Sequence, residues 1–264
     1  METPVAMTIA GSDSSSGAGI QADLKVFTHF GVYALTVVTC VVAEVPGIVS
    51  SIQLIDQETI RKQLELNLIH FPITVIKTGM LYSPEIIDLI SDALKAFQPR
   101  ERPLVVVDPV MIATSGDPLI QPGAIERYTS RLFPLATLVT PNLHEASVLL
   151  NRELKSVDEM RDGAVELYQK FRTPFLLKGG HLQLSEAIDL LVDHEGVHGF
   201  SEPYLPGVST HGTGCTYSAA IAANLALNRS LREAVGSAKQ YISTAIRESF
   251  RWNKNGRTVF ALRH

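Results

Sequence analysis

The chain has 264 residues, of which 45% are hydrophobic, and its 23 Lys and Arg against 27 Asp and Glu give a formal net charge of −4. This composition is that of a folded domain and excludes long disordered stretches. The near-neutral charge argues against nucleic acid as a partner, because binding to a phosphate backbone needs clustered basic residues.

Cys40 and Cys215 are the two cysteines of the chain. Two are too few for a secreted disulfide scaffold or a cysteine-rich zinc site, so we expect a reducing compartment and a cytoplasmic location. The first residues show no basic leader before an apolar stretch, so we expect no signal peptide. The longest apolar run, Ala34–Val45, is shorter than the roughly 20 residues that a membrane helix needs, so we expect no membrane partner.

Short apolar segments alternate with segments of helical periodicity along the whole chain. In the first half we expect strand Val5–Ala10, helix Ile20–Phe30, strands Ala34–Val45 and Ile48–Ile55, helix Gln57–Phe71, strand Thr74–Thr78, helix Pro84–Phe97 and strand Leu104–Val110. In the second half we expect helix Gly123–Phe133, strand Thr137–Thr140, helix Asp158–Phe171, strand Pro174–Lys178, an antiparallel pair Ile188–Val192 and Gly196–Leu205, and helices Gly214–Leu227 and Leu231–Phe250. The pattern leaves the structure of Asn253–His264 open.

The expected strands are continuously apolar rather than alternating, as in Leu104–Val107. Continuous apolar strands are buried on both faces, which is typical of a sheet covered by helices on either side. The fold class is therefore α/β, with a three-layer α/β/α architecture and a mostly parallel central sheet. Because no linker-like stretch, charge block or repeat interrupts the chain, we expect residues 1–264 to form a single domain.

Ligands of open parallel sheets bind outside the carboxyl ends of the strands. The segments that follow the expected strands are Gly11–Gly19, Glu44, Lys77 with Gly79–Met80, Asp108–Pro109, Asn142–Glu145, Lys178–Gly180 and Thr210–Cys215. Polar, acidic and glycine-rich residues thus converge on one edge of the sheet. This convergence favours an enzyme site, although loops are polar and glycine-rich in any protein.

The chain lacks both the G-x-G-x-x-G and the P-loop spacing. The segment 210–216, THGTGCT, instead places Gly212 and Gly214 before a helix, where free N–H groups bind anions. A tight turn that packs a buried helix is the alternative. Cys215 lies in the first turn of this helix, a position that lowers the pKa of a thiol. Its alternative role is that of a small buried apolar residue.

Asn142 and Glu145 lie three residues apart at a helix start and could hold Mg²⁺ near a polyphosphate. The same spacing fits a helix cap and its capping-box partner. Asp108 ends a buried strand, and either a nearby cation or a turn would explain it. Lys178 could neutralise phosphate charge or extend its ammonium to solvent. His211 could be functional or structural.

Several segments together resemble the hydroxymethylpyrimidine/phosphomethylpyrimidine kinases of thiamine biosynthesis, which belong to the ribokinase-like superfamily. The segments are 8–23 (TIAGSDSSSGAGIQAD), 77–80 (KTGM), 108–111 (DPVM), 115–118 (SGDP), 140–145 (TPNLHE), 178–182 (KGGHL) and 210–216 (THGTGCT). They follow the family's order from about residue 5 to 245. The resemblance implies an ATP-dependent kinase for 4-amino-5-hydroxymethyl-2-methylpyrimidine and its monophosphate.

The resemblance also implies roles for individual residues. The pyrimidine pocket would be lined by Gly11, Asp23, Val42, Glu44, Met80 and Asp108. Position 44 is often glutamine in this family, so Glu44 could alter the affinity for the pyrimidine and its pH dependence. Its carboxylate could accept from the 4-amino group and pair with a protonated ring nitrogen.

At the phosphate end, the resemblance assigns Lys178 to the ATP phosphates. It assigns Asn142 and Glu145 to Mg²⁺, through water, and the segment Gly212, Thr213, Gly214 and Cys215 to an anion hole. Cys215 as thiolate, or a base near it, would accept the proton of the alcohol. The resemblance also implies a homodimer.

Two alternatives stay open at this point. A pyridoxal or pyridoxine kinase is the first, because those substrates also carry a hydroxymethyl group on a six-membered aromatic ring. A ligand-binding protein without turnover is the second, against which the intact anion-hole and N-x-x-E motifs argue.

Overall fold

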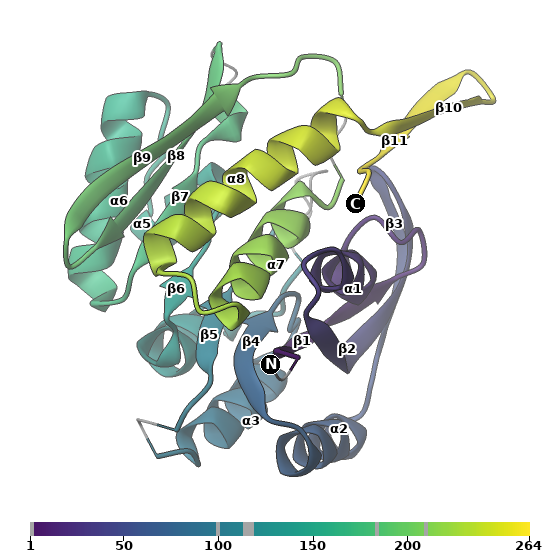
Figure 1. The fold of residues 1–264 in the computed structure, drawn as a ribbon, viewed down its shortest axis with the longest axis vertical. Coiled ribbons are helices and arrows are strands. Elements are labelled where there is room, and N and C mark those ends of the chain that lie inside the picture. The colour runs from purple at the N-terminus through teal and green to yellow at the C-terminus, as the bar shows by residue number, and fades with distance from the viewer. Residues whose placement is uncertain (1–2, 99–100, 113–118, 183–184, 209–210) are drawn as a thin grey trace.

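The computed structural model describes residues 3–98, 101–112, 119–182, 185–208 and 211–264 (Figure 1). A nine-stranded sheet of order β3-β2-β1-β4-β5-β6-β7-β8-β9 forms its centre. The strands are β1 Val5–Asp13, β2 Tyr33–Val45, β3 Ile48–Leu54, β4 Ile73–Thr78, β5 Leu104–Val107, β6 Leu138–Val139, β7 Phe175–Lys178, β8 Glu186–Asp193 and β9 Gly196–Pro203. The helices are α1 Gly19–His29, α2 Gln57–His70, α3 Pro84–Lys95, α4 Ala124–Arg127, α5 Leu143–Leu150, α6 Val157–Phe171, α7 Thr213–Ala226 and α8 Leu231–Arg247.

The sheet is mostly parallel, as the sequence predicts. Strands β2, β1, β4, β5, β6 and β7 run parallel to one another. The edge strand β3 is antiparallel to β2, and β8 and β9 form the expected antiparallel pair at the other edge. The carboxyl ends of six neighbouring strands therefore meet along one side of the sheet.

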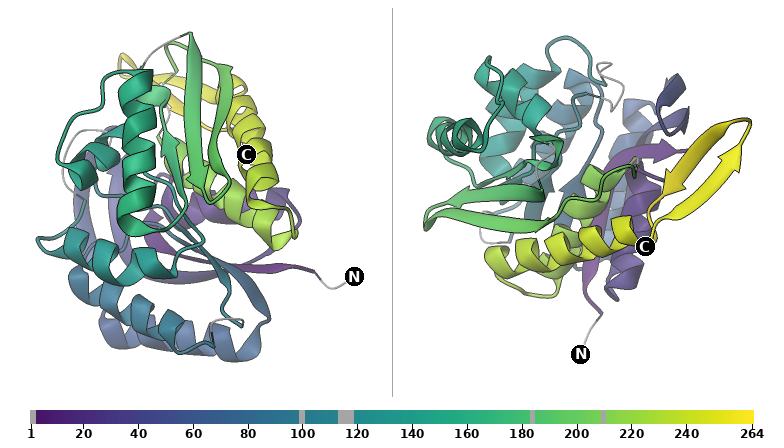
Figure 2. Two further views of the ribbon diagram at one scale, coloured as in Figure 1. Left: turned by 90° about the vertical axis from the view of Figure 1, so that its left-hand side faces the viewer. Right: turned by 90° about the horizontal axis from the view of Figure 1, so that it is seen from above.

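Helices cover both faces of the sheet, which confirms the three-layer architecture (Figures 1 and 2). Helices α1, α7 and α8 pack on one face, and α2, α3, α5 and α6 pack on the other. Alternate residues of a single strand enter the two cores, so that Val105 and Val107 contact one core and Val106 the other. This two-sided burial explains why the strands are continuously apolar.

Capping side chains fix the starts of several helices. Asp56 accepts a hydrogen bond from the Thr59 N–H at the start of α2, and Ser83 accepts one from the Ile86 N–H at the start of α3. The helix predicted over Gly123–Phe133 is less regular than expected, because α4 passes into a π-helical turn and then a 3-10 turn. Within the described residues, no helix is both long and apolar enough to cross a membrane.

The C-terminal segment corrects the predicted end of helix Leu231–Phe250 and supplies a structure for the tail, which the sequence pattern left open. Helix α8 ends at Arg247, and Phe250–Lys254 (β10) pairs with Arg257–Ala261 (β11) as an antiparallel hairpin. The hairpin extends away from the three layers (Figure 1). Asn255 and Gly256 both have positive φ, at 51° and 74°. Asn-Gly is a strong hairpin signal, so the sequence contained the information that we missed.

Candidate functional site

A cavity of about 760 Å³ lies at the carboxyl ends of the parallel strands. Most of the residues that the sequence analysis selected line this cavity. They are Gly11, Val42, Glu44, Met80, Asp108, Asn142, Glu145, Lys178, Gly212, Thr213, Gly214 and Cys215. Segments from both ends of the chain thus converge on one space, as expected for the ligand side of a parallel sheet.

Asp23 is the exception, and its predicted place in the pyrimidine pocket is corrected. Its side chain is fully buried, and both carboxylate oxygens accept hydrogen bonds from Lys77 Nζ at 2.9 Å. Thr8 Oγ1 donates a third hydrogen bond to this carboxylate. The pair joins α1 to the central strands, so Asp23 supports the floor of the site rather than facing a ligand.

The start of α7 has the geometry of an anion site. Gly212 is the N-cap residue with φ 80° and, having no side chain, makes no side-chain capping hydrogen bond to the first turn. A Cβ on Gly212 would lie 1.7 Å from the Gly17 carbonyl oxygen, so only glycine fits there. A Cβ on Gly214 would lie 3.2 Å from Lys178 Nζ. The helix N-terminus and one ammonium group therefore act on the same small volume.

The pKa of the Cys215 thiol is raised, whereas the sequence analysis expected it to be lowered. Burial raises the pKa of Cys215 to about 11, and the nearby ammonium of Lys77 offsets only part of this rise. The cost of desolvating a thiolate therefore exceeds the stabilisation from its position at a helix start. At neutral pH the group is a protonated thiol.

Asp108 has the cation that its burial requires. Lys178 Nζ donates to Asp108 Oδ1 at 3.0 Å, and the hydroxyls of Thr140 and Ser218 also donate to this carboxylate. Although burial opposes ionisation, Lys178 and Lys77 hold the pKa of Asp108 below its ordinary value. An ionised carboxylate and an ammonium group thus face the cavity together.

Asn142 and Glu145 form the capping box that was the alternative to a metal site. Asn142 Oδ1 accepts from the Glu145 N–H, and Glu145 Oε2 accepts from the Asn142 N–H, both at 2.9 Å. Glu145 Oε1 accepts from the Met111 N–H at 3.1 Å. Burial raises the pKa of Glu145 to about 7, and the Asp108 charge adds to the rise. The oxygen donors of Asn142 and Glu145 fit Mg²⁺, whose charge would relieve the repulsion between the Glu145 and Asp108 carboxylates.

Glu44 lies on another wall of the cavity, beside the apolar side chains of Val42 and Met80. Its side chain is 14% exposed, and its ion pair is with His211, at 4.0 Å between Oε2 and Nε2. Among the described residues, none donates a hydrogen bond to the Glu44 carboxylate. Burial and the charge of Asp13 raise the pKa of Glu44, whereas His211 opposes the rise.

Asp13 and His211 also line the cavity; the sequence analysis placed Asp13 only within the segment Gly11–Gly19 and left His211 open as functional or structural. The Asp13 carboxylate accepts the N–H groups of Ser15, Gly17 and Ala18, and it contacts His211 Nε2 at 3.1 Å. Despite burial, these hydrogen bonds lower the pKa of Asp13 to about 2. Asp13, Glu44 and His211 have ligand atoms within 4.8 Å of one another, as in a metal site. Because donors already occupy the Asp13 oxygens, an ion there would have to displace several of them.

A second buried pair lines the cavity beside α8. Lys239 Nζ lies 2.7 Å from Asp189 Oδ2, and Asp189 Oδ1 accepts the Gly179 N–H at 3.0 Å. The pair therefore holds the turn that follows Lys178. The sequence signal for this pair was Asp189, a single acidic residue within the apolar strand Ile188–Val192, which needs a partner if it is buried.

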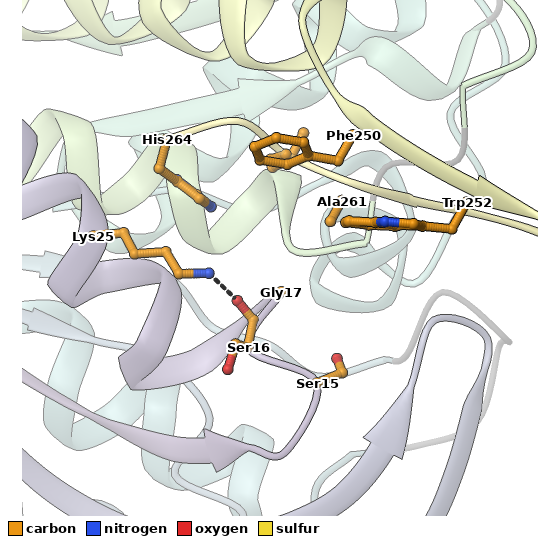
Figure 3. A pocket seen from close by; sticks show the side chains of 9 residues that line it. Ser15, Ser16, Gly17, Lys25, Phe250, Trp252, Ala261 and His264 are labelled. Carbon is orange, nitrogen blue, oxygen red and sulfur yellow. Dashed lines mark hydrogen bonds between the residues drawn. The ribbon is translucent and has the colours of Figure 1, made fainter.

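Residues of the loop 14–18 and of the C-terminal hairpin line a smaller pocket of about 250 Å³. Figure 3 shows Lys25 on one side of this pocket and the rings of Phe250 and Trp252 on the other. Lys25 Nζ donates to the Ser16 carbonyl oxygen at 2.7 Å. Segment 115–118, Thr210 and the side chain of His181 lie outside the described residues.

Comparisons with known proteins agree with this geometry. A family model described as phosphomethylpyrimidine kinase matches residues 13–259. Thiamine biosynthesis bifunctional protein ThiED of Geobacter sulfurreducens is 44% identical over 241 residues, which cover 91% of this chain and 49% of that protein. The hydroxymethylpyrimidine/phosphomethylpyrimidine kinase of Rhizobium meliloti is 41% identical over 245 residues, which cover 92% of this chain and 91% of that protein. The chain thus spans about half the length of the first curated relatives that it matches.

A crystal structure of an ADP complex of Bacillus subtilis pyridoxal kinase has the same fold. Its TM-score is 0.88 at 38% sequence identity, and the match covers 99% of this chain and 98% of that chain. The likeness identifies the present sheet and its two helical layers as a ribokinase-like fold.

Proposed function

Because the chain belongs to the phosphomethylpyrimidine kinase family, we propose that it transfers the γ-phosphoryl group of ATP to 4-amino-5-hydroxymethyl-2-methylpyrimidine and then to its monophosphate. The diphosphate would serve thiamine biosynthesis. One observation carries the proposal: a single cavity contains both an anion hole beside Lys178 and a carboxylate, Glu44, that lacks a hydrogen-bond donor among the described residues. The first feature suits the phosphoryl group and the second suits an amino-bearing ring.

The pyrimidine would bind between Glu44 and the apolar side chains of Val42 and Met80. The Glu44 carboxylate accepts from the 4-amino group and from a protonated ring nitrogen, in two charge-assisted hydrogen bonds. Gly11 belongs to the same wall. A Cβ there would lie 2.8 Å from Cys40 Sγ, so the backbone is close-packed behind the ring.

ATP would place its phosphates between Lys178 and the first turn of α7. The ADP complex of the pyridoxal kinase relative supports nucleotide binding in this fold. Asn142 and Glu145 would hold Mg²⁺ through water, and the bound ion would supply neutralising charge to the polyphosphate. Lys178 approaches the phosphates while its pairing with Asp108 keeps it in place.

In the reaction, the alcohol oxygen bonds to the γ-phosphorus, the bond from that phosphorus to the ADP oxygen breaks, and the alcohol proton leaves. The N–H groups of Gly214 and Cys215 stabilise the charge on the transferring group. Using the Cys215 thiolate as acceptor would first cost about 5 kcal/mol at neutral pH, given its pKa of about 11. Asp108 is already ionised, so we assign the proton to Asp108 and retain Cys215 as part of the anion hole.

The direct test is product analysis. The protein is incubated with Mg·ATP and the pyrimidine alcohol, and the products are identified by mass spectrometry. We expect the monophosphate to appear first and the diphosphate later. Unchanged alcohol in the presence of ATP would contradict the proposal, and accumulation of the monophosphate alone would remove its second step.

Pyridoxine kinase activity is the second candidate, and the likeness to the Bacillus subtilis pyridoxal kinase favours it. Pyridoxine also presents a hydroxymethyl group on a six-membered ring, but it lacks the amino group next to the ring nitrogen. Glu44 would then lose one of its two donors. We therefore expect the pyrimidine to be the better substrate of this chain.

Four further statements belong to the proposal. Residues 1–264 act as one domain, which the continuous nine-stranded sheet supports.

The chain forms a homodimer, which the uncharged edge strand β3 with exposed Ile48 and Val49 supports. It is cytoplasmic, in keeping with its two free cysteines. Its partners are ATP and the pyrimidine alcohol, with neither nucleic acid nor membrane among them.

A further inference from the structure

We propose that His211, held in place by Asp13, is a positioning residue that pairs with the Glu44 carboxylate, and that this arrangement selects cationic, amino-bearing heterocycles. The inference deepens the proposed function and rests on it. Three segments supply the three groups: the end of β1, the end of β2 and the residue before the anion hole. Recognition of the ring and stabilisation of the phosphoryl group would therefore meet at one short segment, His211–Cys215.

The position of His211 is fixed from two sides. Its Nε2 lies 3.1 Å from Asp13 Oδ2 and 4.0 Å from Glu44 Oε2, so one ring atom lies between two carboxylates. On the other side, a Cβ on Gly17 would lie 2.7 Å from His211 Cδ2, so the imidazole edge packs closely on the loop. Gly212 packs against the same loop so closely that an added Cβ would clash with the Gly17 carbonyl oxygen.

Asp13 cannot turn away from His211, because its carboxylate also holds the loop. Three backbone N–H groups at 2.6 to 3.0 Å fix both of its oxygens. The Ser15 hydroxyl adds a further donor. Asp13 is therefore a permanent anion whose direction is set by the backbone, and it orients the histidine in turn.

The charges around Glu44 show what this arrangement does. Asp13 and burial disfavour a second carboxylate in the cluster, and they raise the pKa of Glu44. Contact with both carboxylates raises the pKa of His211 despite its burial. The thiol of Cys40 on β2 is a further titratable group near Glu44, and burial raises its pKa, so it adds no charge. Lys25 on α1 is directed to the Ser16 carbonyl oxygen. His211 is thus the cation that permits Glu44 to carry its charge.

With His211 protonated and Glu44 ionised, two carboxylates and one imidazolium would leave one negative charge in the cluster. The Glu44 carboxylate faces the cavity without a hydrogen-bond donor from the described residues, so a ligand must supply the donors. A protonated aminopyrimidine offers two N–H groups and a compensating positive charge. A neutral ring that presents a lone pair to Glu44 is rejected, because its acceptor would oppose a carboxylate.

A double-mutant cycle with His211→Gln and Glu44→Gln tests the inference. The probe is 4-amino-2,5-dimethylpyrimidine, which lacks the hydroxyl group, and its binding is measured by calorimetry between about pH 5 and 8. We expect His211→Gln to weaken binding about tenfold or more when Glu44 is present and to change it little in the Glu44→Gln background. We also expect His211→Gln to move the loss of binding at low pH to a higher pH.

Equal weakening by His211→Gln in both backgrounds would overturn the inference, because a merely structural histidine would not distinguish glutamate from glutamine at position 44. An unmoved pH profile would overturn it as well. His198→Gln is the matched control, since His198 lies 3.7 Å from Asp193 at the opposite edge of the sheet and should change neither property. ADP binding and thermal unfolding report whether each variant is folded, and His211→Asn replaces any His211→Gln protein that is not.

The probe cannot be phosphorylated, so this experiment is independent of turnover. Absence of kinase activity together with the expected coupling would contradict the proposed function and keep the selective cluster. Kinase activity without coupling between His211 and Glu44 would keep the proposed function and contradict the selective cluster.

Discussion

At the scale of single residues, two buried aspartates at the ends of parallel strands have different partners and different uses. Asp13 is surrounded by backbone N–H groups and one histidine, whereas Asp108 is paired with Lys178 and two hydroxyl groups. The first arrangement fixes a loop, and the second keeps an ionised group beside the start of α7. We therefore predict different effects when each aspartate is replaced, on stability for Asp13 and on kcat for Asp108.

Replacing Asp13 with Asn should make stability less dependent on acid pH. The folded-state pKa of about 2 lies below the ordinary 3.8, so the ionised group stabilises the fold above about pH 4 and this contribution disappears as the pH falls toward 2. We expect Asp13→Asn to lower the free energy of unfolding by at most about 2 kcal/mol at neutral pH. Urea unfolding at several pH values measures this. Glu65→Gln, at an exposed position on α2, is the control, and an equal loss at pH 2 and pH 7 would contradict the assignment.

Variants of Asp108 and Cys215 separate the two possible proton acceptors. If Asp108 takes the proton, Asp108→Asn should lower kcat about 100-fold or more, and Cys215→Ala should lower it about 10-fold with little change in thermal unfolding. The raised pKa of Cys215 also predicts slow alkylation of this thiol at neutral pH. Rapid alkylation, or a larger loss of kcat in Cys215→Ala than in Asp108→Asn, would return the role to the thiolate.

At the scale of elements, the start of α7 and the loop 14–18 are interlocked through glycine. Gly212 has positive φ and approaches the Gly17 carbonyl oxygen more closely than any side chain would permit, and Gly17 in turn packs closely against the His211 ring. The sequence indicated an anion site from two glycines before a helix. It could not show that Gly212 also packs against a loop near the other end of the chain.

Gly212→Ala should therefore disable the anion hole. The added Cβ would lie 1.7 Å from the Gly17 carbonyl oxygen, so the first turn of α7 must move away from the loop. We expect kcat/KM to fall by about 100-fold or more, as on loss of an oxyanion donor. Gly199→Ala on β9 is the control, because its Cβ would meet only Leu190 Cδ2 at 3.9 Å. Similar kinetics for the two variants would refute the close approach.

The buried pair of Asp23 and Lys77 joins α1 to β4. Lys77→Met leaves the buried Asp23 carboxyl group without its cation, so we expect a loss of about 3–5 kcal/mol in the free energy of unfolding. The double variant Asp23→Leu/Lys77→Met removes both charges and should recover most of that loss, as measured by urea unfolding. A double variant no more stable than Lys77→Met would show that the pair itself, rather than an uncompensated charge, is what stabilises the fold.

At the scale of the whole molecule, the hydrophobic periodicity of the sequence was sufficient to predict the three layers and the mostly parallel sheet. Strands such as β5 are apolar because they separate two cores, and this signal is local. The partners of buried charges are not local: Lys77 lies 54 residues from Asp23, and His211 lies 198 from Asp13. Their pairing depends on the sheet order, which the sequence alone did not supply. The hairpin β10–β11 differs from these pairs because its signal is local: the Asn255-Gly256 turn could have been predicted from the sequence and was not.

The most direct test of the central claim is the ratio of kcat/KM for the pyrimidine alcohol to that for pyridoxine, measured by ADP release with Mg·ATP under one set of conditions. With Glu44 accepting two N–H groups that only the pyrimidine supplies together, the account predicts a ratio of about 10 or more, since an unpaired buried polar group costs about 1–3 kcal/mol. A ratio below one would contradict the assignment of the pyrimidine as substrate.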